Sequence, residues 1–132
     1  MKDPIFEQLK QTLTKAYSPY SGVQVAAAIE YEIDGESFIE YGVNVENVSY
    51  GLTQCAERNA ICSAVTKGMK KITSVRLMSN QEAPLTPCGA CRQVIVEFAA
   101  DASTWIESKS MQDDVAWHCT VPELLPSAFV LK

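Results

Sequence analysis

The chain has 132 residues, of which 47% are hydrophobic and 20% are charged, and its formal net charge is −5. This length predicts one domain over 1–132, which buries roughly two-thirds of its unfolded surface without a disulfide scaffold. No apolar run approaches the roughly 18 residues of a membrane span, Met1–Pro4 lacks a signal peptide's apolar core, and the negative charge disfavours a nucleic-acid polymer as ligand. A small neutral ligand fits this composition better.

Helix and strand signals alternate along the first half of the chain. A helix is predicted over 4–16, because an N-cap and a proline open it and apolar residues then recur at helical spacing. The turn signal Asp34-Gly35 separates two runs of strand-forming residues, over 23–32 and 37–45, and so predicts a β-hairpin.

The second half continues the alternation. A second helix is predicted over 54–67, ending before Gly68, which suits the left-handed position after a helix. Ala56, Ala60, Ile61, Ala64 and Val65 are expected on its buried side. The remaining predicted elements are a short strand over 75–78, a helix over 87–100, edge strands over 104–106 and 115–118, and a closing helical turn over 121–125. This alternation implies a layered α/β sandwich.

Two short stretches, Thr53–Ala60 and Thr86–Gln93, together predict one metal site. Each begins with a threonine suited to cap a helix, which would place Cys55 and Cys88 at the second helical position. Free N–H groups and the helix dipole favour the thiolate there, the form that binds metal. Cys91 lies on the same helical face as Cys88. Three thiolates can hold one zinc ion and leave a fourth tetrahedral position open, as catalytic sites do.

The cysteines also have structural interpretations. The three could be buried structural thiols, or Cys-x-x-Cys could be a redox pair, although the strand-turn context of thioredoxin is missing. A closed four-cysteine zinc site in an interaction module would need Cys62. That residue lies seven positions after Cys55, about 10 Å along one helix, whereas sulfurs sharing a zinc lie about 4 Å apart. We therefore assign Cys62 to core packing, and His118 and Cys119 to structural roles. The odd cysteine count favours a reducing cytoplasm.

Four polar residues complete the candidate site. Glu57 stands two residues after the first ligand, so it points toward water beside the metal and is interpreted as a proton carrier; the alternative is an exposed glutamate favoured by the helix dipole. Arg58 is either a surface charge or a group that offsets the negative charge of three thiolates. Asn44 and Glu46 alternate on an extended segment and so point the same way, which suits a diol; simple loop polarity is the alternative.

Cys-x-Glu followed by Pro-Cys-x-x-Cys resembles the signature of the zinc nucleoside and nucleobase deaminases. Most of the chain resembles the small cytidine deaminases with three cysteine ligands, the tetrameric branch of that family. This resemblance implies a three-layer α/β/α sandwich with a mixed central sheet of about five strands. The stretches that carry it are Tyr17–Ser21, Asn44–Tyr50, Cys55–Arg58, Pro87–Gln93 and Glu123–Pro126.

The resemblance also implies an activity, a cofactor and an assembly. The activity is the hydrolytic deamination of cytidine and deoxycytidine to the uridines plus ammonia, with one zinc ion per chain activating water and Glu57 carrying protons. The assembly is a homotetramer. Implied roles are Asn44 and Glu46 on the ribose hydroxyls, the Ala56 N–H and the Cys88 backbone near the ring, Arg58 on a ligand sulfur, Gln93 around the ligands, and Tyr50 and Phe129 in a neighbouring subunit's pocket.

The sequence departs from this family at one position. Close relatives typically read Phe-x-Val-Gly-Ala-Ala where this chain reads Val23-Gln24-Val25-Ala26-Ala27-Ala28. Val23 therefore replaces the aromatic residue that would stack on the pyrimidine. A modified nucleoside or a blasticidin-like antibiotic thus stays open as an alternative substrate.

Overall fold

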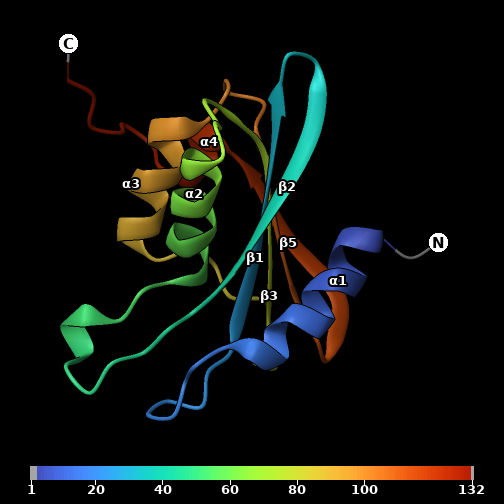
Figure 1. The fold of residues 1–132 in the computed structure, drawn as a ribbon, viewed down its shortest axis with the longest axis vertical. Helices are drawn as coiled ribbons and strands as arrows, with labels where there is room; N and C mark the ends of the chain where they lie inside the picture. The colour runs from blue at the N-terminus through green and yellow to red at the C-terminus, as the bar shows by residue number, and fades with distance from the viewer. Residues whose placement is uncertain (1–2, 132) are drawn as a thin grey trace.

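The computed structural model describes residues 3–131, so Met1 and Lys2, which carry half of the segment used for the signal-peptide prediction, lie outside it, as does Lys132. None of the helices within this range is both long enough and apolar enough to cross a membrane. The elements in chain order are α1 Pro4–Thr12, η1 Leu13–Lys15, β1 Val25–Ile33, β2 Glu36–Val43, η2 Tyr50–Leu52, α2 Ala56–Thr66, β3 Ile72–Ser79, α3 Gly89–Phe98, β4 Trp105–Ser110, β5 Asp113–Thr120 and α4 Val121–Leu124 (Figure 1).

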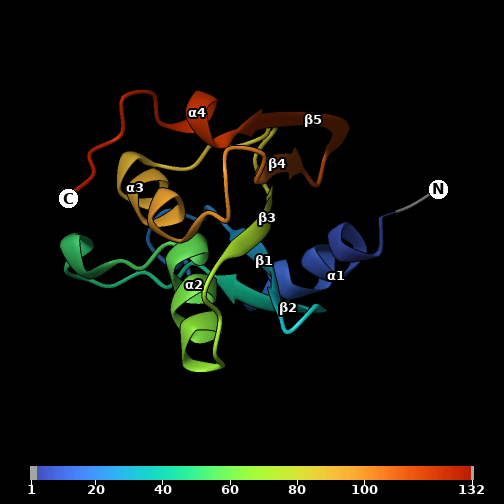
Figure 2. The same ribbon diagram turned by 90° about the horizontal axis from the view of Figure 1, so that it is seen from above.

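The strands form one mixed sheet in the order β2-β1-β3-β4-β5. Only β3 and β4 run parallel; the other neighbouring pairs are antiparallel. Figure 2 shows α1 on one side of the sheet and α2 and α3 on the other. The predicted three-layer sandwich with a mixed sheet of about five strands is therefore confirmed.

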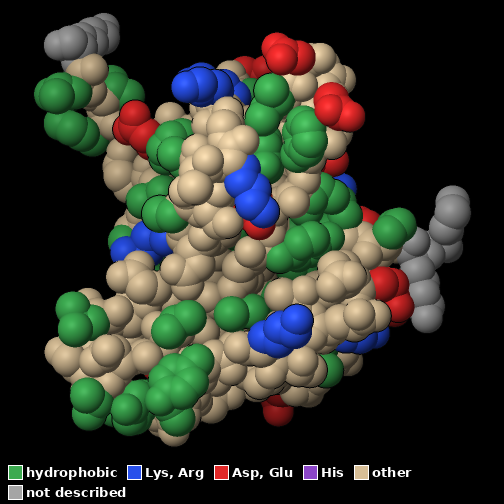
Figure 3. All heavy atoms as spheres, viewed as in Figure 1, with side chains coloured by type: hydrophobic (Ala, Val, Ile, Leu, Met, Phe, Trp, Pro, Cys, Tyr) green, Lys and Arg blue, Asp and Glu red, His purple; other side chains and the backbone are tan. Residues whose placement is uncertain are grey.

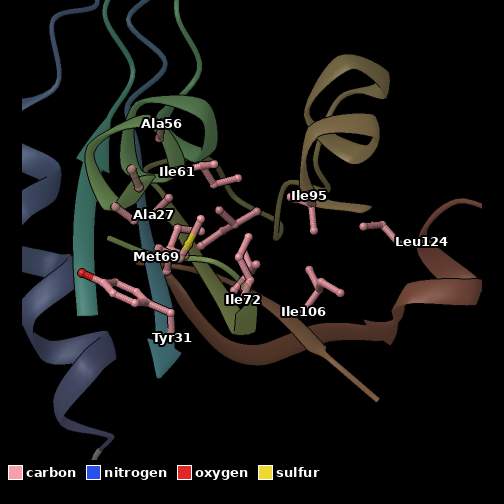
Figure 4. Packing of buried hydrophobic residues seen from close by; sticks show 14 of the residues in the cluster. Ala27, Tyr31, Ala56, Ile61, Met69, Ile72, Ile95, Ile106 and Leu124 are labelled. Atoms are coloured by element: carbon pink, nitrogen blue, oxygen red, sulfur yellow. The ribbon is translucent and has the colours of Figure 1, made fainter. Parts of the chain in front are cut away.

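The core lies on both faces of the sheet, because side chains alternate along β1. Ala27 and Ile29 belong to the larger cluster beneath α2, α3 and α4, while Ala26 and Ala28 face α1. Figure 4 shows side chains from the helices pointing toward the sheet in the larger cluster. Each fully buried Ile or Leu stabilises the fold by about 1.5–3 kcal/mol relative to an exposed one.

The prediction of an edge strand over 104–106 is wrong, because β4 lies inside the sheet between β3 and β5. The hydrophobic pattern of the sequence does not reveal that β4 is buried, because two of its buried residues are serines. Ser108 and Ser110 are buried, and their hydroxyls donate to the backbone carbonyls of Leu85 and Gln81 in the loop before α3. Buried hydroxyls satisfied in this way can occupy core positions without penalty.

The buried face of α2 also differs from the prediction. Ala56, Ala60 and Ala64 form a stripe of small side chains that lets the helix backbone approach β2. The contact between α2 and β2 is centred on this stripe. Cys62 is therefore exposed and Val65 is 44% exposed, so the assignment of both to the core is wrong.

Gly42 of β2 provides a test of this close approach. A Cβ built there would lie 2.6 Å from the Ala60 nitrogen and 2.7 Å from the Ala56 carbonyl oxygen, both of them backbone atoms. Gly42→Ala should therefore lower the free energy of unfolding by about 1–3 kcal/mol, as overpacking does. Urea denaturation of zinc-loaded protein measures this. Gly51→Ala, where a Cβ meets nothing within 4 Å, is the matched control and should change stability by less than about 0.5 kcal/mol. Equal effects of the two substitutions would contradict the argument.

Candidate metal centre and adjoining pocket

The two helix starts place the cysteines one step earlier than the sequence pattern predicts. Cys55 and Cys88 are the N-cap residues of α2 and α3, so their assignment to the second helical position is wrong. Thr53 cannot cap α2 because it ends the short η2 turn, and the next residue, Gln54, pairs with Val45 in a β-bridge. At the second site Thr86 is likewise not the cap. Both sulfurs still lie at the positive end of a helix.

Three sulfur atoms converge at these helix starts. Those of Cys55, Cys88 and Cys91 lie within 4.8 Å of one another, and the first two are 3.9 Å apart. Thiolates that bind one zinc at about 2.3 Å have this separation, so the donor set fits zinc. Across residues 3–131 no His, Asp, Glu or other Cys joins the group. The prediction that these three cysteines come together where they could bind one metal ion is confirmed.

Arg58 lies against one of the ligand sulfurs. Its Nη2 is 3.3 Å from the Cys55 sulfur. Hydrogen bonds from Cys91 and then Arg58 lower the pKa of Cys55 to about 5, despite partial burial. The pKa of Cys91 is raised by its hydrogen bond to Cys55 and by burial. The thiolate is therefore favoured at Cys55, and Cys91 keeps its proton. The guanidinium thus favours a thiolate at Cys55.

Glu57 is buried beside the thiols. Its exposed fraction is only 5%, so the alternative of a solvent-exposed glutamate is wrong. Burial raises its pKa to about 7, and the negative charge of Cys55 acts in the same direction. A carboxyl group with such a pKa exchanges a proton readily near neutral pH.

A pocket of about 230 Å³ opens next to the thiols. It brings together residues from the start of β1, the loop after β2, the two helix starts and the end of β3. Five lining residues were not predicted from the sequence as site residues: Val25, Thr53, Leu77, Leu85 and Thr86. Leu85 and Thr86 directly precede Pro87-Cys88, and this position could have indicated them. The lining residues are Val23, Val25, Asn44, Glu46, Thr53, Cys55, Ala56, Glu57, Leu77, Leu85, Thr86 and Cys88.

Asn44 holds the part of the pocket lining that Val23 and Val25 contribute. Its Nδ2 donates to the Val23 carbonyl at 2.8 Å, and its Oδ1 accepts from the Val25 N–H at 2.9 Å. Glu46 accepts hydrogen bonds from the Ser21 hydroxyl and from two backbone N–H groups of the same turn, which lower its pKa. Asn44 and Glu46 both line the pocket, as their alternation predicts.

Within one chain, three predicted site residues lie outside both the pocket lining and the thiol cluster with its neighbouring arginine. Tyr50 and Phe129 are 74% and 71% exposed, and Tyr50 lines a smaller neighbouring cavity of about 190 Å³ that shares Glu46 with the pocket. Gln93 is exposed and donates to the Phe129 carbonyl at 3.4 Å rather than to a ligand. His118 stacks on a tryptophan ring, away from the thiols.

The fold and the three thiols define a zinc-binding α/β protein with an open coordination position. Residues 2–106 match the family model for the cytidine and deoxycytidylate deaminase zinc-binding region, which spans all three thiols. The chain belongs to this family.

Its relatives share most of its length. A cytidine deaminase from Halalkalibacterium halodurans is 40% identical, with 97% of this chain and 93% of the relative covered. One from Sporosarcina psychrophila is 39% identical over 96% of this chain and 90% of the relative. The crystal structure of cytidine deaminase from Burkholderia pseudomallei superimposes with a TM-score of 0.84 at 37% identity, covering 98% of this chain and 100% of that one.

Zinc content tests the centre directly. Purified wild type should hold one zinc per chain, and Cys88→Ala should lose it, because two thiols bind far more weakly than three. Cys62→Ala is the matched control: this thiol is exposed and lies outside the sulfur cluster, so zinc should stay at one per chain. Metal analysis after gel filtration gives the ratio. Full zinc in Cys88→Ala, or two zinc ions in wild type, would contradict the site.

Proposed function

We propose that this protein catalyses the hydrolytic deamination of cytidine and deoxycytidine to uridine and deoxyuridine with release of ammonia. One observation carries the proposal: the buried Glu57 carboxyl group and two thiols of the zinc-suited cluster line the same small pocket as the polar side chains of Asn44 and Glu46. The named activity of the relatives supports the choice of reaction.

In this proposal the metal ion serves to activate water. Zinc held by Cys55, Cys88 and Cys91 would supply a Lewis acid that activates a water molecule as nucleophile. Arg58 stabilises the charge of this centre by donating to the Cys55 sulfur.

Glu57 is the proton carrier in this proposal. Its carboxylate takes a proton from the attacking water and delivers it to N3 of the pyrimidine as oxygen bonds to C4. It then takes the second proton from the hydroxyl now bonded to C4 and passes it to the amino group; the C4–N bond breaks, ammonia leaves, and the C4 carbonyl of the uridine forms. Burial excludes bulk water from the carboxyl group, and a pKa near the working pH suits both steps.

The other residues that line the pocket orient the substrate in this proposal. We assign the Ala56 N–H and the Cys88 backbone to contacts with the ring, since N–H groups in a first helical turn have no partner within the helix. Asn44 and Glu46 are assigned to the ribose hydroxyls. The ring then lies between the thiols and the start of β1, where Val23 contributes an aliphatic wall.

Replacing Glu57 by Gln tests the proton carrier. The amide keeps the shape but cannot exchange protons, so the variant should fold, retain zinc and lose two to four orders of magnitude in turnover. Conversion of cytidine to uridine is followed by absorbance, with zinc content measured in parallel. Glu36→Gln, an exposed position on β2, is the control and should keep full activity. Activity of Glu57→Gln within tenfold of wild type would overturn the assignment.

A modified or bulkier nucleoside is the second candidate substrate, favoured by the side chains around the ring. Among the described lining residues none is aromatic; Val23, Leu77 and Leu85 are aliphatic. An aromatic pair contributes about 0.5–1.5 kcal/mol beyond area burial.

Val23→Phe should therefore lower KM for cytidine by a few-fold to about tenfold with kcat nearly unchanged, because stacking acts on ground and transition states alike. Kinetics on cytidine and on 5-substituted cytidines separate the candidates. If the substitution raises KM for cytidine and wild type prefers the bulkier compounds, the second candidate replaces the first.

We further propose a cytoplasmic homotetramer of single-domain subunits, in which Tyr50 and Phe129 complete neighbouring pockets. Exposed apolar side chains support an interface: Figure 3 shows them on the C-terminal tail, where Val130 and Leu131 are 65% and 87% exposed. Light scattering at micromolar concentration should give four times the chain mass. A fully active monomer would remove both aromatic residues from the site.

A further inference from the structure

We propose that Ser21 is a positioning residue that orients the Glu46 carboxylate toward the sugar hydroxyls of the substrate. Ser21 would thereby set the preference of the pocket for nucleosides whose sugar carries the 3′ hydroxyl that cytidine and deoxycytidine share. This inference rests on the proposed deamination of nucleosides, because it assigns Glu46 to the sugar end of the pocket.

The Glu46 carboxylate, on a half-buried residue, accepts three hydrogen bonds from one neighbouring turn. Its Oε1 accepts from the Tyr20 N–H at 3.0 Å and from the Ser21 N–H at 3.2 Å. Its Oε2 accepts from the Ser21 hydroxyl. A free surface glutamate samples several rotamers, whereas these three donors fix one.

The turn that carries these donors is itself anchored. Gly22 adopts a φ of +74°, and its N–H donates to the Ser18 carbonyl at 3.0 Å, closing the turn. Tyr17 forms a parallel bridge beside Glu46: its N–H donates to the Asn44 carbonyl, and its carbonyl accepts from the Glu46 N–H at 2.8 Å. The donors and the carboxylate therefore belong to one rigid unit.

The Ser21 hydroxyl also reaches the ring side of the pocket. It accepts from the Val23 N–H at 3.0 Å while donating to Glu46. A hydroxyl can do both at once; alanine can do neither, and threonine can do both. The Val23 backbone has a second support in Asn44, so losing the hydroxyl frees the carboxylate far more than the ring-side wall.

The remaining capacity of Glu46 defines what it recognises. An ionised carboxylate only accepts hydrogen bonds and offers about four lone-pair sites, of which three are used here. The free site, on Oε2, suits a neutral hydroxyl donor. No Lys or Arg belongs to the described lining of the pocket or of the neighbouring cavity, so nothing there would favour an anionic sugar substituent.

The experiment compares cytidine with 2′,3′-dideoxycytidine on zinc-loaded wild type, Ser21→Ala, Ser21→Thr and Ser18→Ala. The constants are KM and kcat for cytidine, and the inhibition constant of 2′,3′-dideoxycytidine against cytidine turnover. Ser21→Ala should raise KM for cytidine about ten- to a hundredfold with kcat within about threefold, the range expected for losing a hydrogen bond to a charged group. The inhibition constant should change less than about twofold, because that sugar lacks the hydroxyls Glu46 contacts.

The other variants separate positioning from general damage to the turn. Ser21→Thr should restore KM to within about twofold of wild type, and Ser18→Ala, in the same turn, should match wild type. In a Glu46→Gln background, Ser21→Ala should add little, because the two act through one group. Equal weakening of both ligands, or an unchanged KM in Ser21→Ala, overturns the positioning role while the proposed function stands. Wild type that deaminates no cytidine nucleoside overturns both.

Discussion

The close approach of three cysteine sulfurs is the interaction on which the site depends. The sulfurs of Cys55 and Cys88, 33 residues apart in the chain, lie 3.9 Å apart without forming a disulfide. Two unit charges at this distance repel by roughly 4 kcal/mol near a protein surface. Part of that repulsion is offset. Both residues lie at the N-cap positions of helices, where the helix dipole is positive, and Arg58 donates a hydrogen bond to the Cys55 sulfur. A divalent cation offsets the rest, so this grouping is favourable chiefly as a metal site.

The framework that brings the sulfurs together does not itself require the metal. On one side Gly42 lets the backbone of α2 rest directly on β2. On the other, Ile95 of α3 is fully buried in the same cluster as Ile106 of β4. Close packing against the sheet thus fixes both helices, α2 from its first turn onward, and the cysteines at the helix starts inherit their positions. A site preorganised in this way loses little conformational entropy when a ligand binds.

Much of this could be predicted from sequence, because it rests on local pattern. Helical spacing and the Asp34-Gly35 turn signal were enough for the element order, and the spacing of Cys55, Cys88 and Cys91 was enough for the ligands. What failed depends on contacts between distant residues. The start of α2 is set by a bridge between Val45 and Gln54, and the interior place of β4 by serines that bond to a distant loop. Cys62 lies outside the core because α2 packs on β2 through a stripe of alanines. The number of hydrophobic residues in the helix does not show which of its faces makes that contact.

The two ends of the pocket are stabilised by different physics. The metal end is built from helix starts on a packed core, whereas the opposite end consists of loops held by hydrogen bonds between side chains and backbone. Asn44, only 8% exposed, uses both the nitrogen and the oxygen of its side-chain amide to hold Val23 and Val25, and Glu46 is fixed by the turn before β1. The loop residues Val23, Asn44 and Glu46 are not members of the buried cluster beneath α2 and α3. Substrate preference can therefore vary at the loop end while the chemistry at the helix starts stays the same.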